Sequence, residues 1–316
     1  MSFFSILLAL LLEQARPLAS GNLVHAGMRG WMRWVVRNFD AGKTSHGWLA
    51  WSLAVGAPSL VTLVIYWLLL ALIGWPVAML WSITVLYVTL GFRQFSYHFT
   101  DIRKALDEGD EARARTLLAE WQQIDAGDLP RQEIIRHVIE HSVVSAHRHV
   151  FGVLSWVSVL AALGLGPAGA VFYRQSEFVT RYWSYLSSQQ GQPVSDAARA
   201  AANRAWQLVD WIPARITALG FAVVGNFEEA IDNWRHYETQ PDADNDGVIL
   251  AATAGAVNVR LRETVASAEG EQEPMVATTR QEPELAHLRS IVGLVWRSVV
   301  LWMTLLALLT LARLLG

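Results

Sequence analysis

The sequence predicts an all-α, polytopic integral membrane protein, and three observations support that fold class. The mean hydropathy of the 316 residues is +0.27 and only 17% of them are charged, which is too apolar for a soluble chain of this length. The segment from Thr44 to Phe92 contains no Asp, Glu, Lys or Arg. Many of the fifteen tryptophans flank apolar blocks, as an interfacial aromatic belt does. We therefore expect one membrane-embedded domain over residues 1–316 that crosses a lipid bilayer several times.

Charge and cysteine content exclude several classes of protein. The net charge of −3 provides no basic field that would recruit nucleic acid. The chain has no cysteine, which excludes disulfides, thiol catalysis and cysteine metal sites.

The N-terminal third contains three predicted membrane elements. Residues 2–12 are apolar but too few to span comfortably, so we expect a short membrane-associated helix. The next segment interleaves arginines with tryptophans, which predicts an amphipathic helix on the inner membrane surface. The charge-free segment then suits two transmembrane helices, 48–73 and 76–92, joined by a turn at Gly74-Trp75-Pro76.

The middle of the chain alternates between polar and apolar segments. Residues 93–149 are rich in arginine and are therefore expected on the cytoplasmic side, with a helix–turn–helix over 101–121. A third spanning candidate, 150–173, is interrupted by glycines and Pro167. A helix broken in this way is tolerated only against protein or a cavity.

One apolar segment in the last part of the chain contains both an acidic and a basic residue, Asp210 and Arg215. Residues 208–225 either span the membrane or form a re-entrant segment, with Asp210 suited to a helix N-cap and Pro213 to a first helical turn. An acidic, proline-containing stretch at 268–284 predicts a mobile loop. Residues 291–315 form the last predicted transmembrane helix.

Two short motifs suggest metal chemistry without completing a site. His137-Val-Ile-Glu140-His141 matches the His-x-x-Glu-His zinc pattern, but no later carboxylate stands in a recognisable ligand motif. A membrane zinc hydrolase is therefore a distant alternative. Residues 242–247 resemble the first half of a calcium loop, but Thr253 stands where a bidentate Glu is required. We predict no bound metal and no cofactor.

Three segments together resemble one family of membrane proteins. The first, residues 98–118, begins at His98 and contains Ala-Leu, Gly-Asp and Ala-Arg-Ala-Arg. The second is Val-Asp-Trp-Ile-Pro-Ala-Arg-Ile-Thr-Ala at 209–218, and the third is Asn-Asp-Gly at 245–247 followed by Ala-Thr-Ala-Gly at 252–255. In this order they resemble the CobD/CbiB superfamily, which includes the adenosylcobinamide-phosphate synthases of cobalamin biosynthesis and the AmpE membrane proteins.

The resemblance implies two functions that the sequence leaves open. The synthases join cobyric acid to aminopropanol or its phosphate through an amide bond, using acidic groups to hold a metal-nucleotide or to manage protons. Here Val144, Ser145, Arg148, Trp206 and Gln207 stand where the synthases usually carry acidic or amide side chains.

The Asp-Trp-Ile-Pro form of the second segment is closer to the AmpE proteins. The main prediction is accordingly an AmpE-like protein with a regulatory, sensory or ligand-binding role on a degenerate synthase site. The alternative is an amide-forming synthase of the cobalamin pathway, using Glu140, Asp210, Asn245 and Asp246. In either case the resemblance implies a protein of the bacterial inner membrane. An anionic small molecule or a corrinoid would be the ligand, and a homo-oligomer is compatible with the sequence. The candidate ligand-site residues are Glu140, Arg148, Asp210, Arg215, Asn245 and His98.

Overall fold

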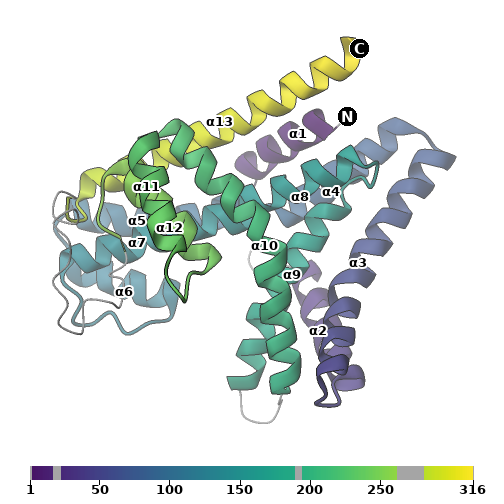
Figure 1. Cartoon of the computed structure of the whole chain (residues 1–316), viewed down its shortest axis with the longest axis horizontal. Helices are drawn as coiled ribbons and strands as arrows, with labels where there is room; N and C mark the ends of the chain where they lie inside the picture. The colour runs from purple at the N-terminus through teal and green to yellow at the C-terminus, as the bar shows by residue number, and fades with distance from the viewer. Residues whose placement is uncertain (1, 17–22, 189–193, 262–280, 316) are drawn as a thin grey trace. The chain divides into compact units, whose positions relative to one another are not determined.

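The computed structural model describes residues 2–16, 23–188, 194–261 and 281–315 (Figure 1). Within these ranges the regular structure is helical, apart from one isolated bridge between Val259 and Gln281. Four helical stretches in this part of the chain are long and apolar enough to cross a membrane: 44–72, 131–162, 196–224 and 285–313. These findings confirm the predicted all-α, polytopic membrane fold class.

The chain folds into two compact units, residues 1–92 with 148–213 and residues 93–147 with 214–316. The first unit contains α1 (Ser2–Ala15), α2 (Leu23–Phe39), α3 (Thr44–Leu72), α4 (Trp75–Thr89), most of a π-helical turn (His147–Phe151), α8 (Gly152–Ala162), α9 (Ala168–Ser188) and the first part of α10 (Asp196–Val224). The second contains α5 (Phe92–Asp107) from its second residue, α6 (Glu111–Gln122), α7 (Arg131–Ala146), the rest of α10, α11 (Phe227–Glu238), α12 (Asn245–Val257) and α13 (Leu285–Leu315).

Most predicted apolar segments coincide with helices. Residues 2–12, 48–73, 76–92 and 291–315 fall on α1, α3, α4 and α13, and the helix–turn–helix at 101–121 is confirmed by α5 and α6. Which of these helices cross a bilayer, and whether 1–316 acts as one domain, stay predictions. The expected mobile loop at 268–284 lies outside the described residues up to position 280.

The predicted third span, 150–173, is not one helix. Helical structure runs unbroken from Arg131 to Ala162 and then stops. Gly164 and Gly166 have φ angles of +80° and +57°, a left-handed conformation that glycine adopts without strain. A new helix, α9, begins at Ala168. The glycines therefore end one helix and start another, because their backbone conformation cannot continue an α-helix.

The prediction that Asp210 caps a helix starting at Pro213 is wrong. Helix α10 is continuous from Asp196 to Val224, with Pro213 inside it. Proline has no N–H, so the carbonyl of Val209, four residues earlier, loses its helical donor. The indole N–H of Trp156 donates to that carbonyl at 3.0 Å. This hydrogen bond allows the helix to pass through the proline.

The same arrangement recurs in α3. Pro58 lies within the helix, and the carbonyl four residues earlier belongs to Ala54. The indole N–H of Trp31 donates to it at 3.2 Å. Both Trp31 and Trp156 therefore satisfy helix carbonyls that an internal proline leaves without a donor.

The amphipathic helix predicted on the membrane surface is α2, and its apolar face packs on protein. Met32 and Val35 are fully buried in a core that they share with residues of α3, α9 and α10, including the fully buried Trp183. The apolar periodicity was detected correctly, but it could not distinguish a protein core from a lipid surface.

In the second unit, α11 and α12 pack at very short range. Gly255 faces the backbone of Glu229 and Ala230, where a side chain would not fit. Ala218 of α10 forms a small core with Val248 and Ala252 of α12, against which Trp234 and Tyr237 pack.

Candidate functional site

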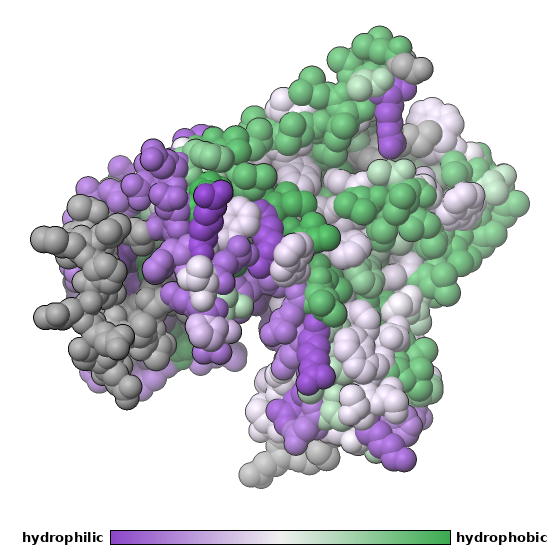
Figure 2. Space-filling view, viewed as in Figure 1, coloured by the Kyte–Doolittle hydropathy of each residue, from purple (hydrophilic) through white to green (hydrophobic). Residues whose placement is uncertain are grey.

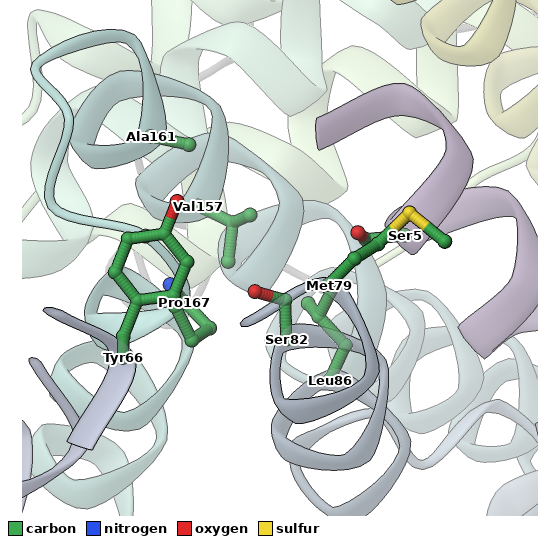
Figure 3. Close-up of a pocket in the computed structure, with 9 residues that line it drawn as sticks. Ser5, Tyr66, Met79, Ser82, Leu86, Val157, Ala161 and Pro167 are labelled. Atoms are coloured by element: carbon green, nitrogen blue, oxygen red, sulfur yellow. The ribbon is translucent and has the colours of Figure 1, made fainter. Parts of the chain in front are cut away.

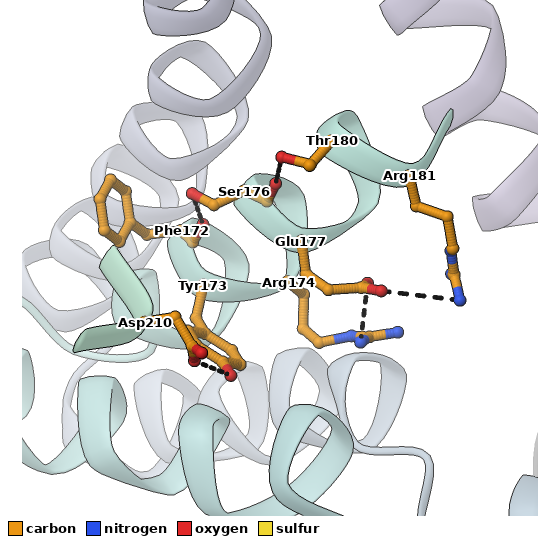
Figure 4. Close-up of polar contacts among 8 residues, drawn as sticks. All are labelled: Phe172, Tyr173, Arg174, Ser176, Glu177, Thr180, Arg181 and Asp210. Carbon is orange, nitrogen blue, oxygen red and sulfur yellow. Dashed lines mark hydrogen bonds and ion pairs between the residues drawn. The ribbon is translucent and has the colours of Figure 1, made fainter. Parts of the chain in front are cut away.

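A buried tyrosine–aspartate pair lies in the first unit. Tyr173 of α9 and Asp210 of α10 are both fully buried, and the tyrosine hydroxyl donates to Asp210 Oδ1 at 2.7 Å (Figure 4). Gly152 of α8 lies so close to the Tyr173 ring that any added side chain would overlap it. The small residue therefore positions the tyrosine against the carboxylate.

An ion-pair triad extends from the same helix. The carboxylate of Glu177 accepts from Arg174 at 3.1 Å and faces Arg181 at 3.6 Å (Figure 4). The Glu177 side chain is 3% exposed and that of Arg174 is 11% exposed, whereas that of Arg181 is 58% exposed. Burial alone would raise the pKa of Glu177, but the charges of Arg174 and Arg181 outweigh burial and lower it to about 2.

Further cations surround this triad. Arg148 in the π-helical turn lies over the Trp206 ring, 5.9 Å from its centroid, and interacts electrostatically with both Tyr173 and Glu177. Burial first, and then the positive charges of Arg174, Arg29 and Arg181, lower the pKa of His25. Cations therefore outnumber the two carboxylates in this network, which suits it to an anionic ligand.

A second polar cluster lies in the second unit. Arg215 of α10 donates through Nη1 to Asn245 Oδ1 at 2.9 Å and through Nη2 to Glu238 Oε1 at 2.7 Å. Asn245 is the first residue of α12, which Asp244 caps by accepting from the N–H of Gly247 at 2.7 Å. Two segments that the family resemblance identified, 209–218 and 245–247, thus meet through one side chain.

His98 and residues of the two predicted metal motifs make aromatic contacts and hydrogen bonds. His98 stacks on Trp121, with ring centroids 5.7 Å apart, and His141 packs edge-on against the same ring at 4.4 Å. Among the described residues, no three His, Asp or Glu side chains gather as metal ligands. The zinc-hydrolase alternative gains no support from this geometry. In the calcium-like segment, Asp244 serves as a helix cap, and the hydroxyl of Tyr237 donates to it at 2.8 Å.

The six predicted site residues are thus distributed over the two units. Arg148 and Asp210 both lie beside Tyr173, while Arg215 and Asn245 are hydrogen-bonded to each other. Glu140 lies half-buried on α7. Residues five apart on an α-helix point about 140° apart, so Asp210 and Arg215 serve different faces of α10.

Sequence reasoning missed Tyr173, Arg174 and Glu177. The signal was present, because Arg174, Glu177 and Arg181 follow each other at spacings of three and four residues, which place charges on one helix face. It was overlooked because the same spacing of charges fits any amphipathic helix.

The first unit also contains a pocket between α1, α3, α4 and α8 (Figure 3). Its lining includes Ser5, Tyr66, Ser82 and Val157 but no carboxylate, arginine, lysine or histidine. Its volume is about 430 Å³, including space open to the outside. It lacks the charged groups of the network around Glu177, so we place the candidate site at the network.

Helices of membrane-spanning length, together with charged groups gathered in the protein interior, define a multi-pass membrane protein with a polar site. The family model described as "CobD/Cbib protein" matches residues 7–295. The chain belongs to the CobD/CbiB family.

Several relatives share this family. A protein of Stutzerimonas stutzeri (strain A1501), described as "Cobalamin biosynthesis protein CobD", is 31% identical over 268 residues, which cover 84% of this chain and 82% of the relative. A protein of Chromobacterium violaceum with the same description is 31% identical over 182 residues, 57% of this chain and 54% of the relative. One from Desulfotalea psychrophila, also described in this way, is 26% identical over 217 residues, 64% of each chain. No solved structure matches the chain.

These findings favour the cobalamin-pathway alternative over the main prediction of an AmpE-like regulatory protein. The family match and the relatives' descriptions point to cobalamin biosynthesis. The substitutions at Val144, Ser145 and Trp206 had suggested a degenerate site, but they do not outweigh similarity over most of the chain.

Proposed function

We propose that this protein acts in cobalamin biosynthesis as an adenosylcobinamide-phosphate synthase of the bacterial inner membrane. It would form an amide between a carboxyl group of cobyric acid and the amine of aminopropanol or its phosphate. The observation that carries the proposal is the contact of Arg215 with Asn245, because it joins two segments by which the family is recognised.

The charges of the first unit support this chemistry. Cobyric acid carries a carboxylate, and aminopropanol carries an anionic group in its phosphorylated form. Arg148, Arg174 and Arg181 supply positive charge around Asp210 and Glu177. Guanidinium groups hold carboxylates and phosphates through paired, charge-assisted hydrogen bonds.

Asp210 and Tyr173 suit the proton transfer in this reaction. As the C–N bond forms, the amine loses a proton and the carboxyl carbon loses one oxygen. That oxygen leaves readily once a phosphoryl group has been transferred to it, so that it departs as phosphate; a nucleoside triphosphate, which becomes the diphosphate, is therefore the expected co-substrate. A carboxylate hydrogen-bonded to a tyrosine hydroxyl can accept the amine proton. In this proposal Asp210 is the acceptor, and Tyr173 orients it.

Complementation tests the proposal directly. The wild-type protein should restore growth to a strain that lacks its cobinamide-phosphate synthase, under conditions where cobalamin made from cobyric acid limits growth. Asp210→Asn and Arg215→Met should each reduce that growth strongly. Arg204→Met, at an exposed position of α10, is the matched control and should leave growth unchanged.

Membrane fractions immunoblotted for each variant separate loss of function from loss of the protein. Failure of wild-type protein that is present in the membrane would overturn the synthase assignment and return attention to the regulatory hypothesis. Full growth of both site variants would overturn the assignment of the site.

A further inference from the structure

The α3–α4 hairpin of the first unit ends in an exposed apolar tip. Leu72, Ile73 and Trp75 at the tip are 79%, 62% and 54% exposed. Hydrophobic surface covers this part of the hairpin in Figure 2, and the whole segment from Thr44 to Phe92 has no Asp, Glu, Lys or Arg. A tip that crossed a membrane and emerged into water would ordinarily carry polar side chains.

The two halves of α3 have different surroundings. In the first half, Ala50, Ala54 and Val55 are buried in the core with α2, α9 and α10, and Gly47 contacts the backbone of α10 at Ala197. In the second half, the large side chains are exposed instead: Leu60, Val61, Val64, Trp67, Leu68 and Leu72. Most of the exposed large apolar side chains of α3 therefore lie in its second half, and Leu49, 48% exposed, is the exception in the first half.

The second arm of the hairpin is shorter than a bilayer. The 15 residues of α4 rise about 22 Å at 1.5 Å per residue. The hydrocarbon core of a typical bilayer is about 30 Å thick. α4 is therefore too short to carry the chain back from a tip on the far side, although α3 with its 29 residues is long enough to cross.

Several backbone groups of the hairpin turn are paired within the protein. The N–H groups of Ile73 and Gly74 both donate to the carbonyl of Leu69, at 3.1 and 3.0 Å. The carbonyl of Gly74 accepts from Ala78 at 3.4 Å, and Pro76 has no N–H to satisfy. In hydrocarbon each unsatisfied backbone group costs several kcal/mol, so each of these pairings lowers the cost of placing the turn in lipid.

Polar side chains along the hairpin are paired in the same manner. Their hydroxyls donate to carbonyls four residues earlier: Ser59 to Val55, Thr62 to Pro58, Ser82 to Ala78, Thr84 to Leu80 and Thr89 to Val85. The indole of Trp81 in α4 donates to the Thr62 carbonyl of α3 at 3.2 Å, which ties the two arms together.

We infer that the α3–α4 hairpin is re-entrant: it inserts tip first into the bilayer hydrocarbon, and its tip does not emerge on the far side. Both ends of the hairpin then lie on one side of the membrane. The inference does not depend on the proposed synthase activity.

The absence of cysteine allows a clean test, because a single introduced thiol has no background. Ile73→Cys and Leu72→Cys place the thiol at the tip, and Ser45→Cys places it at the exposed opposite end of α3. Each variant is treated with a charged, membrane-impermeant maleimide in right-side-out and in inside-out vesicles. Denaturation in SDS reveals the total thiol.

A re-entrant hairpin gives labelling of Ser45→Cys from one side only, and no labelling of either tip variant from either side before denaturation. Tip labelling from the side opposite to Ser45→Cys would show that the hairpin spans and would overturn the inference. Tip labelling from the same side would show that the hairpin is not inserted, and would overturn it equally.

A nitroxide on the Ile73→Cys thiol distinguishes lipid from a protein–protein contact. In hydrocarbon the label collides often with oxygen and rarely with a water-soluble nickel chelate. Low accessibility to both reagents would place the tip inside an oligomer interface and would overturn the assignment of lipid as its partner.

Discussion

Removing the indole donor that serves α10 is the sharpest test of how this helix passes through its internal proline. Trp156→Phe keeps a ring against Phe172, whose centroid lies 4.9 Å from that of Trp156, but it deletes the N–H that donates to the Val209 carbonyl at 3.0 Å. Pro213 cannot supply a replacement donor. A buried acceptor left without a partner costs about 1–3 kcal/mol, and we expect the free energy of unfolding to fall by that amount.

A double-mutant cycle isolates the hydrogen bond from the change in ring size. In the Pro213→Ala background the alanine N–H can donate to the Val209 carbonyl, so Trp156→Phe should be less destabilising there by about 1 kcal/mol or more. Unfolding of the detergent-solubilised protein, followed by circular dichroism at increasing SDS concentration, measures the four variants.

Trp31→Phe with Pro58→Ala provides a parallel cycle in α3, where the indole N–H donates to the Ala54 carbonyl. Equal destabilisation by the tryptophan substitutions in the proline and alanine backgrounds would refute the reasoning, because the loss would then come from ring packing alone.

Three further predictions concern the charged network and the close helix contact. The pKa of Glu177 is lowered from 4.5 to about 2. The ionised side chain should therefore add about 3 kcal/mol to the free energy of unfolding, fully present above pH 4.5 and lost as the pH falls toward 2. Glu177→Gln should remove this part of the pH dependence in acid-unfolding curves, and an unchanged curve would contradict the prediction. Tyr173→Phe should lower the free energy of unfolding by about 1–3 kcal/mol, because it removes the hydrogen bond to Asp210. The double variant with Asp210→Asn should lose less stability than the two single variants together, and strictly additive losses in SDS titrations would exclude the coupling. Gly255→Ala should destabilise the protein by about 1–3 kcal/mol because the new methyl group meets the backbone of α11. Gly293 has open space around it, so Gly293→Ala is the control and should change the stability by no more than about 1 kcal/mol. Similar melting temperatures for the two variants would contradict the close packing.

Composition and periodicity were sufficient for the fold class and for most helices. The charge-free run from Thr44 to Phe92 predicted α3 and α4, because burial in lipid or in a core is the only way to remove so much apolar surface from water. The glycines at 164 and 166 marked the interruption in the third apolar segment, but their spacing did not show that the first helix begins as early as Arg131.

The candidate site was predicted in part. Arg215 and Asn245 were singled out from their motifs, and the structure brings them together at 2.9 Å. Tyr173, Arg174 and Glu177 were not singled out, because their importance comes from burial and from neighbours on other helices. Neither property is visible in a local pattern of residues.

By itself, the sequence determined that this is a helical membrane protein, which segments are apolar, and which family it resembles. These properties depend on the hydropathy of consecutive residues and on short motifs, and both are local. Only the tertiary structure decided that Pro213 and Pro58 lie inside continuous helices, since each requires an indole donor that is distant in sequence. It likewise decided that Glu177 is a buried anion between two arginines, because the charge state of a carboxylate depends on the groups that folding places around it.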